Sequence, residues 1–244
     1  KDQNEVSRVK DLSFSVHGGE ILGIAGVSGN GQTELLETLT GIRSFQGGSI
    51  QFGAQKIQSG DKFDASLMRD LGVGHVPEDR QRMGLVTSFV AKENAILGYH
   101  RDKAYNSTFE MDETFMLEDC SSKMKDYDVR PANPELQSSL FSGGNQQKLV
   151  VMREMSRNPE LLIVGQPTRG VDIGAIEFIH RRIIAMRDAG KAVLLVSVEL
   201  DEILSLSDRI LVMFSGEMMG EISADEADER RIGLLMAGIR EKAA

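Results

Sequence analysis

Cysteine is almost absent from this chain, since Cys120 is the only one among 244 residues. An internal disulfide is therefore excluded, and the chain is compatible with a reducing compartment. Long apolar runs are missing too: the longest, such as residues 192–198, have the length of a strand, whereas a helix needs roughly 20 residues to cross a bilayer. We expect Cys120 to be an ordinary packed or half-buried thiol.

Positive charge is also scarce, because 28 lysines and arginines face 37 aspartates and glutamates, which gives a net charge of −9. A general nucleic-acid binder needs a basic surface, so no nucleic-acid partner is expected. The histidines show no metal-ligand spacing. The N-terminus has neither an initiator methionine nor an apolar signal core, and we interpret the sequence as a fragment of a longer chain.

Short apolar stretches alternate with stretches of helical periodicity. This pattern favours an α/β fold, in which helices cover a mostly parallel sheet. Between residues 91 and 129, Met and Phe residues recur at helical spacing among acidic residues, and we interpret this stripe as the core of a helical segment. We expect strands at 20–25, 49–52, 71–76, 161–164, 192–198 and 209–214, and helices at 33–39, 142–157, 176–189 and 199–206.

A glycine-rich loop follows the first buried strand and reads Gly26-Val27-Ser28-Gly29-Asn30-Gly31-Gln32-Thr33. In the phosphate-binding pattern G-x-x-x-x-G-K-[ST], backbone N–H groups surround phosphate oxygens, a lysine reaches the outer phosphates and a hydroxyl ligates Mg²⁺. Gln32 stands at the lysine position and brings no charge, while Thr33 supplies the hydroxyl, as a weak Mg²⁺ ligand. The sequence therefore predicts a phosphate loop that has lost its cation.

A second glycine-rich stretch, Phe141-Ser142-Gly143-Gly144-Asn145-Gln146-Gln147-Lys148, opens a predicted helix. Ser142 is a good N-cap, and the glycines leave backbone N–H groups accessible at the positive end of the helix. Such a helix N-terminus can bind an anion.

This second stretch resembles the signature of ATP-binding cassette (ABC) domains. Further motifs follow in the expected order: 161–168 looks like the Walker B strand, Val171-Asp172 like the end of the D-loop, and 197–202 like the switch region. The resemblance implies an ABC-type P-loop NTPase with an N-terminal antiparallel β part. It implies a core at residues 1–90 and 158–244 and a helical subdomain at about 91–157.

In this family two cassettes sandwich two ATP molecules, each between the phosphate loop of one cassette and the signature of the other. Opening and closing of the sandwich drives a pair of membrane subunits. The resemblance assigns nucleotide binding in this chain's own site to Gly26, Ser28, Gly29, Asn30, Gly31, Gln32, Thr33 and Glu78. It assigns contacts to the partner cassette's ATP to Ser142, Gly143, Gly144, Asn145, Gln146 and Asp172.

Several catalytic positions of the family are changed. Gln32 replaces the lysine, Gly165 the metal-orienting aspartate, Gln166 the catalytic glutamate, Val198 the switch histidine and Glu78 the Q-loop glutamine. Loss of a general base alone costs about 10²–10⁴-fold in rate. We therefore expect the chain's own site not to hydrolyse ATP, and its signature to complete the site of a partner cassette.

The stretches 75–80, 84–86, 93–94 and 166–172 are similar to the second cassette of tandem importer ATPases, and 174–182 favours the nucleoside branch. The expected partners are a first cassette on the same full-length chain, permease subunits that contact residues 78–98 and, indirectly, a substrate-binding lipoprotein. The expected location is the cytoplasmic face of the membrane. A monosaccharide importer and a soluble ABC protein without a permease stay open as alternatives.

Overall fold

The computed structural model describes residues 7–106 and 110–240, and it divides into two compact units. The first unit comprises Lys1–His75, Glu160–Gln166 and Ile183–Ala244. The second comprises Val76–Pro159 and Pro167–Arg182. The division into a core and a helical subdomain at residues 91 and 157 stays a prediction.

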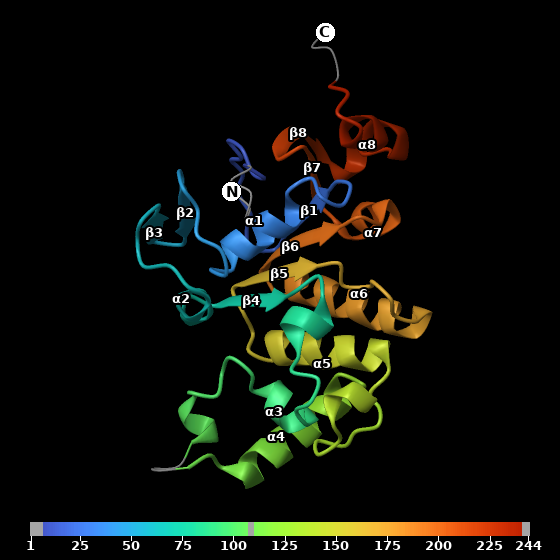
Figure 1. The fold of residues 1–244 in the computed structure, drawn as a ribbon. Coiled ribbons are helices and arrows are strands. Elements are labelled where there is room, and N and C mark those ends of the chain that lie inside the picture. Colours follow the sequence, from blue (N-terminus) through green and yellow to red (C-terminus); the bar gives the residue numbers. More distant parts are fainter. Residues whose placement is uncertain (1–6, 107–109, 241–244) are drawn as a thin grey trace. The chain divides into compact units, whose positions relative to one another are not determined.

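The first unit is built on a six-stranded sheet of order β4-β5-β6-β1-β7-β8 (Figure 1). Strands β5, β6, β1 and β7 are parallel, and β8 runs antiparallel to β7 at the edge. The predicted α/β fold with a mostly parallel sheet is confirmed. The strands are β1 (Ile21–Ala25), β4 (Val73–Val76), β5 (Leu161–Gly165), β6 (Ala192–Ser197), β7 (Arg209–Phe214) and β8 (Glu217–Ser223).

Helices α1 (Gln32–Leu39) and α7 (Leu200–Leu206) cover opposite faces of this sheet. Leu22 and Ile24 of β1 join the core cluster that contains Leu36 of α1. Gly23 points the other way, and a Cβ there would lie 3.2 Å from Cγ2 of Ile203 on α7. Because alternate residues of a strand face opposite sides, a continuous apolar run is what a strand covered on both faces requires.

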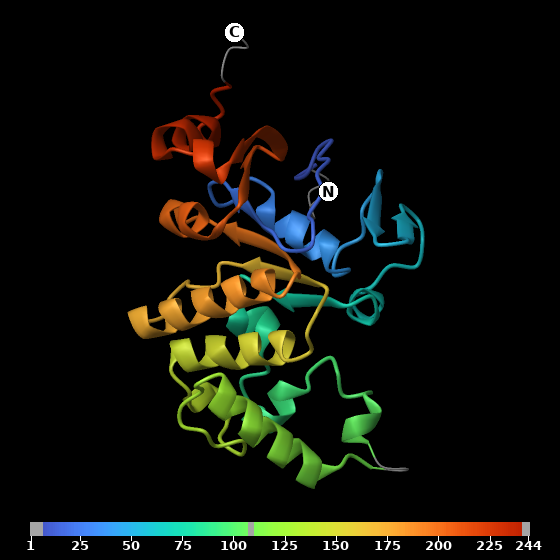
Figure 2. The same cartoon turned by 180° about the vertical axis from the view of Figure 1, so that it is seen from behind.

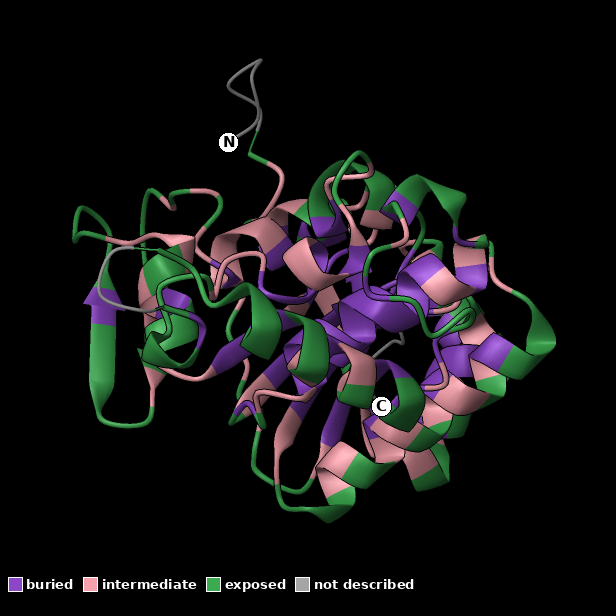
Figure 3. Cartoon of the chain, turned by 90° about the horizontal axis from the view of Figure 1, so that it is seen from below, coloured by how far each residue is buried: buried purple, intermediate pink, exposed green. Residues whose placement is uncertain are grey.

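The N-terminal antiparallel β-structure is a two-stranded hairpin of β2 (Ser49–Phe52) and β3 (Gln55–Gln58). In Figure 3 this hairpin is mostly green, meaning exposed, while the strands of the large sheet carry much of the purple. Residues 9–16 form no strand, yet Leu12, Phe14 and Val16 are packed against the core. Sequence reasoning missed α2 (Ala65–Asp70), β8 and α8 (Glu229–Met236).

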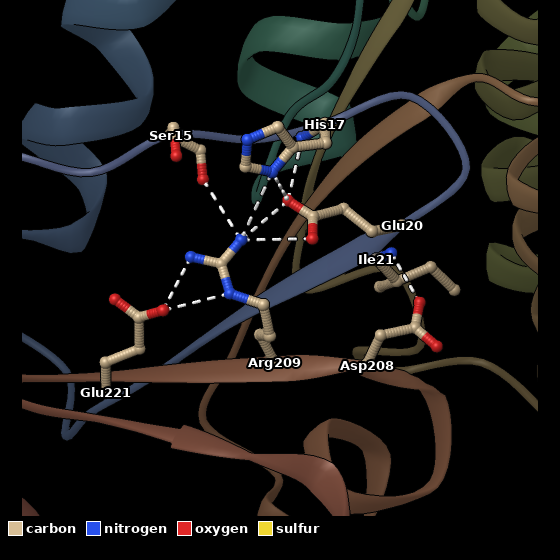
Figure 4. Close-up of polar contacts among 7 residues, drawn as sticks. All are labelled: Ser15, His17, Glu20, Ile21, Asp208, Arg209 and Glu221. Atoms are coloured by element: carbon tan, nitrogen blue, oxygen red, sulfur yellow. Dashed lines mark hydrogen bonds and ion pairs between the residues drawn. The ribbon is translucent and has the colours of Figure 1, made fainter.

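A cluster around Arg209 holds three strands together where β1 and β7 begin and β8 ends (Figure 4). The glycine loop follows the other end of β1. Arg209 bonds Glu20 just before β1, at 2.8 Å between Nη1 and Oε1, and Glu221 on β8, at 2.6 Å between Nη2 and Oε1. The His17 amide also donates to Glu20 Oε1, at 2.7 Å. Asp208 Oδ2 accepts from the Ile21 amide at 2.7 Å.

The second unit is mainly helical. Figure 2 shows α4 (Glu113–Asp126) running beside α5 (Gly143–Met155), which packs in turn against α3 (Ala91–Ala95). Short turns of other helix types join them, namely η1 (Arg80–Gly84), η2 (Lys103–Tyr105) and η3 (Ser138–Leu140), and the unit also holds the first residues of α6 (Ile173–Asp188).

The helical segment predicted at 91–129 is divided into separate helices. Asp102 is the N-cap of η2 and Asp112 is the N-cap of α4, so a new helix begins after each of them. Residues 107–109 lie outside the described part. Met116 and Met124 are buried, as the core interpretation of the methionine stripe requires, whereas Phe115 is exposed.

Cys120 is buried, and burial, with a smaller effect from Asp119, raises the pKa of its thiol to about 12. The expected packed thiol is confirmed. Among the residues that the structure describes, no helix has the length and apolar character of a membrane span.

Candidate nucleotide sites

The glycine loop of residues 26–31 connects β1 to α1 in the first unit. Gly29 and Gly31 have φ values of 89° and 101°, in the left-handed region that favours glycine. Gly31 is the N-cap of α1, and Ser28 and Thr33 are exposed beside it. A bent backbone that leads into a helix N-terminus is the arrangement that binds phosphate.

Asn30 holds this loop against the turn between β7 and β8. Its Oδ1 accepts from the Ser215 amide at 3.1 Å, and its carbonyl accepts from the Gly216 amide at 2.9 Å. The loop therefore has a shape that the protein's own hydrogen bonds maintain.

Gln32, at the lysine position, is turned inward and only 3% exposed. Its Nε2 lies against Gly26, where a Cβ would collide with it. This nitrogen has no hydrogen-bond acceptor among the described residues. An unpaired buried donor costs about 1–3 kcal/mol, so the inward position of Gln32 is unfavourable by itself.

The other wall of this site is formed where β5 and β6 end. Ala25 pairs with Ser197 and Gly165 with Val196 in parallel register, so the carboxyl ends of β1, β5 and β6 meet at one edge. Ligands of open α/β sheets bind at this edge. Gln166 follows β5 with φ of 47°, and its Oε1 accepts from the Val198 amide at 3.4 Å.

The loop offers backbone N–H groups to a phosphate, and the strand-end positions 165, 166 and 198 offer few groups to a metal. Mg²⁺ is usually held by carboxylates and water, and positions 165, 166 and 198 carry none, which leaves the Thr33 hydroxyl. Within the described ranges, no three His, Cys, Asp or Glu side chains gather where they could hold a metal ion. Glu78 belongs to the second unit, just before η1.

The signature residues open α5 in the second unit, and Ser142 is its N-cap, as predicted. Ser142 is exposed, and its Oγ accepts from the Asn145 amide at 3.4 Å and from Asn145 Nδ2 at 2.9 Å. The first N–H groups of a helix have no partner within it. The start of α5 is thus open to an anion from outside the unit.

Gly143 and Gly144 are positions where a side chain would not fit. A Cβ at Gly143 would lie 2.7 Å from Nη2 of Arg80 and 3.0 Å from the Gly170 carbonyl, and one at Gly144 would lie 2.7 Å from Oδ2 of Asp172. The two glycines therefore let Arg80 and Asp172 come close to the helix N-terminus. Asp172 Oδ1 also accepts from the Ala175 amide at 3.0 Å and so caps α6.

Sequence reasoning missed Arg80 as a site residue, although the charged run 78–80 was visible. Its guanidinium donates to the carbonyls of Arg169, at 2.7 Å, and of Gly170, at 3.2 Å. Burial lowers the pKa of Arg80 from its ordinary value, against the opposing effect of Asp79, and an arginine in a protein keeps its charge. Arg80 therefore adds a positive charge beside Gly143.

Gln146 lies in the interior. It is 3% exposed, its Nε2 donates to the Ser138 carbonyl at 3.0 Å, and its Oε1 accepts from Gln81 Nε2 at 3.0 Å. Both ends of the amide are thus used within the unit. Its predicted contact with ATP stays a prediction, and its observed bonds support the first turn of α5.

The comparisons with known proteins agree with this geometry. The ABC transporter family model matches residues 9–169, and the chain belongs to this family. The guanosine import ATP-binding protein NupO of Bacillus subtilis is 46% identical over 244 residues, which are 100% of this chain and 47% of that protein. The nucleoside import ATP-binding protein NupA of Lactococcus lactis is 44% identical over 98% of this chain and 46% of its own length.

A more distant relative, the glucose import ATP-binding protein TsgD13 of Haloferax volcanii, is 38% identical over 97% of this chain and 43% of its own length. The chain thus spans less than half the length of each of these curated relatives.

Solved structures establish the ABC cassette fold. A nucleotide-free ATP-binding cassette from an ABC transporter matches with a TM-score of 0.77 and 20% identity over 97% of this chain and 92% of that one. A dimeric cassette in a post-hydrolysis state, bound to ADP and Pi, matches with a TM-score of 0.73 and 21% identity over 89% of this chain and 90% of that one.

Proposed function

We propose that this chain is the second cassette of a tandem importer ATPase. In this proposal it completes a partner cassette's ATP site with its signature and does not hydrolyse ATP in its own site. The observation that carries the proposal is the contrast between the two sites. The start of α5 keeps an exposed serine N-cap, two glycines and Asp172, whereas positions 165, 166 and 198 at the strand ends beside the glycine loop carry no carboxylate.

The chemistry of phosphoryl transfer supports this division. Transfer depends on positioning and on stabilising charge at the γ-phosphate, which a lysine, metal-binding acids and a switch histidine normally supply. Gln32, Gly165, Gln166 and Val198 supply none of that charge. The exposed N-terminus of α5, with Arg80 beside it, provides positive potential for an ATP that another cassette holds.

In this proposal the glycine loop of residues 26–31 still binds nucleotide, although it does not support hydrolysis. Its left-handed glycines at the N-terminus of α1 would bind nucleotide phosphates weakly or hold a nucleotide as a clamp. The residues proposed for this site are Gly26, Ser28, Gly29, Asn30, Gly31, Gln32 and Thr33; Glu78, which the resemblance also assigned to it, lies in the second unit.

A permease is the proposed membrane partner, with residues 78–98 as the contact surface. Met83 and Phe89 of this segment are 39% and 40% exposed, and exposed apolar side chains mark interaction surfaces when they gather. The chain would then lie at the cytoplasmic face of the membrane and would serve a substrate-binding lipoprotein through the permease.

A nucleoside is the proposed cargo, because the nucleoside import proteins are 46% and 44% identical and the glucose import protein is 38% identical. Uptake of labelled guanosine and glucose by vesicles that hold the full-length ATPase and its permease distinguishes the two cargoes. Glucose uptake without guanosine uptake would favour the monosaccharide alternative.

The ATPase proposal is tested by steady-state hydrolysis of Mg-ATP. The isolated chain is expected to show no turnover above background, and the chain assembled with a competent first cassette is expected to be active. Robust turnover by the isolated chain would overturn the proposal. A chain that fails to copurify with a permease when the full-length protein is used would favour a soluble ABC protein.

A further inference from the structure

The hydroxyl oxygen of Ser142 accepts hydrogen bonds on the side that faces α5. A serine hydroxyl has one donor hydrogen and two acceptor lone pairs, and Oγ of Ser142 accepts twice from Asn145, at 3.4 Å from the amide nitrogen and at 2.9 Å from Nδ2. Among the described residues this hydroxyl has no acceptor of its own. Because both acceptor sites face the helix, the hydrogen points away from it.

The side chain of Asn145 is oriented in turn. Its Oδ1 accepts from the Arg130 amide at 2.7 Å. A backbone N–H can only donate, so the oxygen of the amide must face Arg130 and the NH₂ group must face Ser142. The reversed amide would set two donors against each other and leave Ser142 without this bond.

The Arg130 amide is placed by an anchor one turn further along α5. Lys148 donates to Asp128 at both its carbonyl, at 3.0 Å, and its Oδ2, at 2.8 Å. Arg130 Nε donates to Asp128 Oδ1 at 2.7 Å. Lys148 also lies over the Phe178 ring, 4.9 Å from its centroid.

Asp128 takes a left-handed backbone with φ of 50°, which a non-glycine residue adopts where its surroundings hold it. The hydrogen bonds from Lys148 and Arg130 outweigh burial and lower the pKa of its carboxyl, so Asp128 is charged at neutral pH. Segment 128–130 is therefore tied to α5 at two points, Lys148 and Asn145.

We propose that Asn145, anchored by Asp128 through the Arg130 amide, is a positioning residue that aims the Ser142 hydroxyl outward as a donor to a phosphate oxygen. This inference rests on the proposed role of the signature in a partner's ATP site. It gives Asn145 an action through Ser142 in place of a direct contact with ATP. The exposed end of this chain of contacts, or relay, is the Ser142 hydroxyl, and its other end is the Asp128–Lys148 ion pair, in which Lys148 is buried and the Asp128 carboxylate is partly exposed.

A double-mutant cycle in the assembled pair of cassettes tests this relay, with kcat and KM for Mg-ATP as readouts. Ser142→Gly is the variant of choice because glycine at an N-cap costs only a few tenths of a kcal/mol, whereas alanine costs about 1. Asn145→Ala removes the orienting amide, and Asp128→Asn weakens its anchor and keeps its size. Melting curves of each variant report folding.

Ser142→Gly and Asn145→Ala are each expected to lower kcat by about 10- to 100-fold, the value of one hydrogen bond to a charged group. The double variant is expected to equal Ser142→Gly alone. Asp128→Asn should lower kcat severalfold with Ser142 in place and have no effect in the Ser142→Gly background.

A purely structural role of Asn145 would lower kcat by the same factor in both backgrounds, and such multiplicative losses would overturn the relay alone. If Ser142→Gly leaves kcat unchanged, the relay and the proposed role of the signature fail together. The two failures are therefore distinguishable in one experiment.

Discussion

Gln166 and Val198 show how single replacements change what the own site can do. Where a carboxylate would activate water, the neutral amide of Gln166 accepts a hydrogen bond from the Val198 amide and so joins the ends of β5 and β6. Gln166 keeps a left-handed backbone, a conformation that clusters at functional sites. Gln166 thus contributes a neutral amide at the end of β5, where the proposal of a site that does not hydrolyse ATP requires the absence of a carboxylate.

Replacement of Gln32 tests the loop directly. In Gln32→Lys the ammonium is expected to reach the phosphates and tighten binding of Mg-ADP and Mg-ATP by about tenfold, since charge-assisted hydrogen bonds are roughly twice as strong as neutral ones. Hydrolysis should stay at background, because Gln166 and Gly165 are unchanged.

Isothermal titration calorimetry of the chain measures this change, with Gln58→Lys on the exposed hairpin as the matched control. An affinity that rises equally in both variants would point to net charge alone, and an unchanged affinity in Gln32→Lys would mean that the loop holds no phosphate.

The predictability of the elements followed their burial. Strands β1, β5 and β6 are almost wholly buried, and a strand covered on both faces appears in the sequence as an unbroken apolar run. By contrast β8 has mostly partly buried and exposed residues, so its sequence has no such run. The loop position of Asn30 could be predicted from its glycine neighbours. Its hydrogen bond with Ser215 could not, because the two residues lie far apart in the sequence.

Site chemistry was predictable where a motif carries it and not where a distant residue completes it. The N-cap role of Ser142 follows from the local sequence. The inward orientation of Gln146 depends on Gln81, 65 positions away, and Arg80 approaches Gly143 only because η1 and the segment around Gly170 meet there.

At the element scale, Arg209 is expected to hold β1, β7 and β8 together. In Arg209→Met the Glu20 carboxylate, 14% exposed, loses its cationic partner, and we expect a loss of about 1–3 kcal/mol in the free energy of unfolding. Burial raises the pKa of Glu20, but bonds from the His17 amide and Arg209 outweigh it and leave the pKa below 4.5.

A carboxyl whose pKa is lower in the folded state than in the unfolded state stabilises the fold at pH values above its unfolded-state pKa. This stability is lost as the pH falls through the folded-state pKa. Without Arg209 the folded pKa rises, so acid unfolding should begin at a higher pH. Circular dichroism during acid titration measures the midpoint, with Arg240→Met as control because its pair with Glu217 is long and exposed. Equal midpoints for the wild type and Arg209→Met would contradict the role of Arg209 in holding β1, β7 and β8 together.

For the whole molecule, the two candidate sites lie in different units and are incomplete in different ways. In this proposal the first unit has a phosphate loop without catalytic acids at positions 165 and 166, and the second has a helix start that would bind an anion held by a partner. We propose that each site needs a partner cassette, and that only the signature site contributes to turnover.

The most direct measurement is Mg-ATP hydrolysis by the assembled pair that carries Ser142→Arg. The added side chain would block the start of α5, so turnover is expected to fall to background although the substitution lies in the cassette that we propose does not hydrolyse ATP. Ser122→Arg, the same change on the exposed side of α4, should leave turnover intact. Full activity of the Ser142→Arg pair would contradict the account.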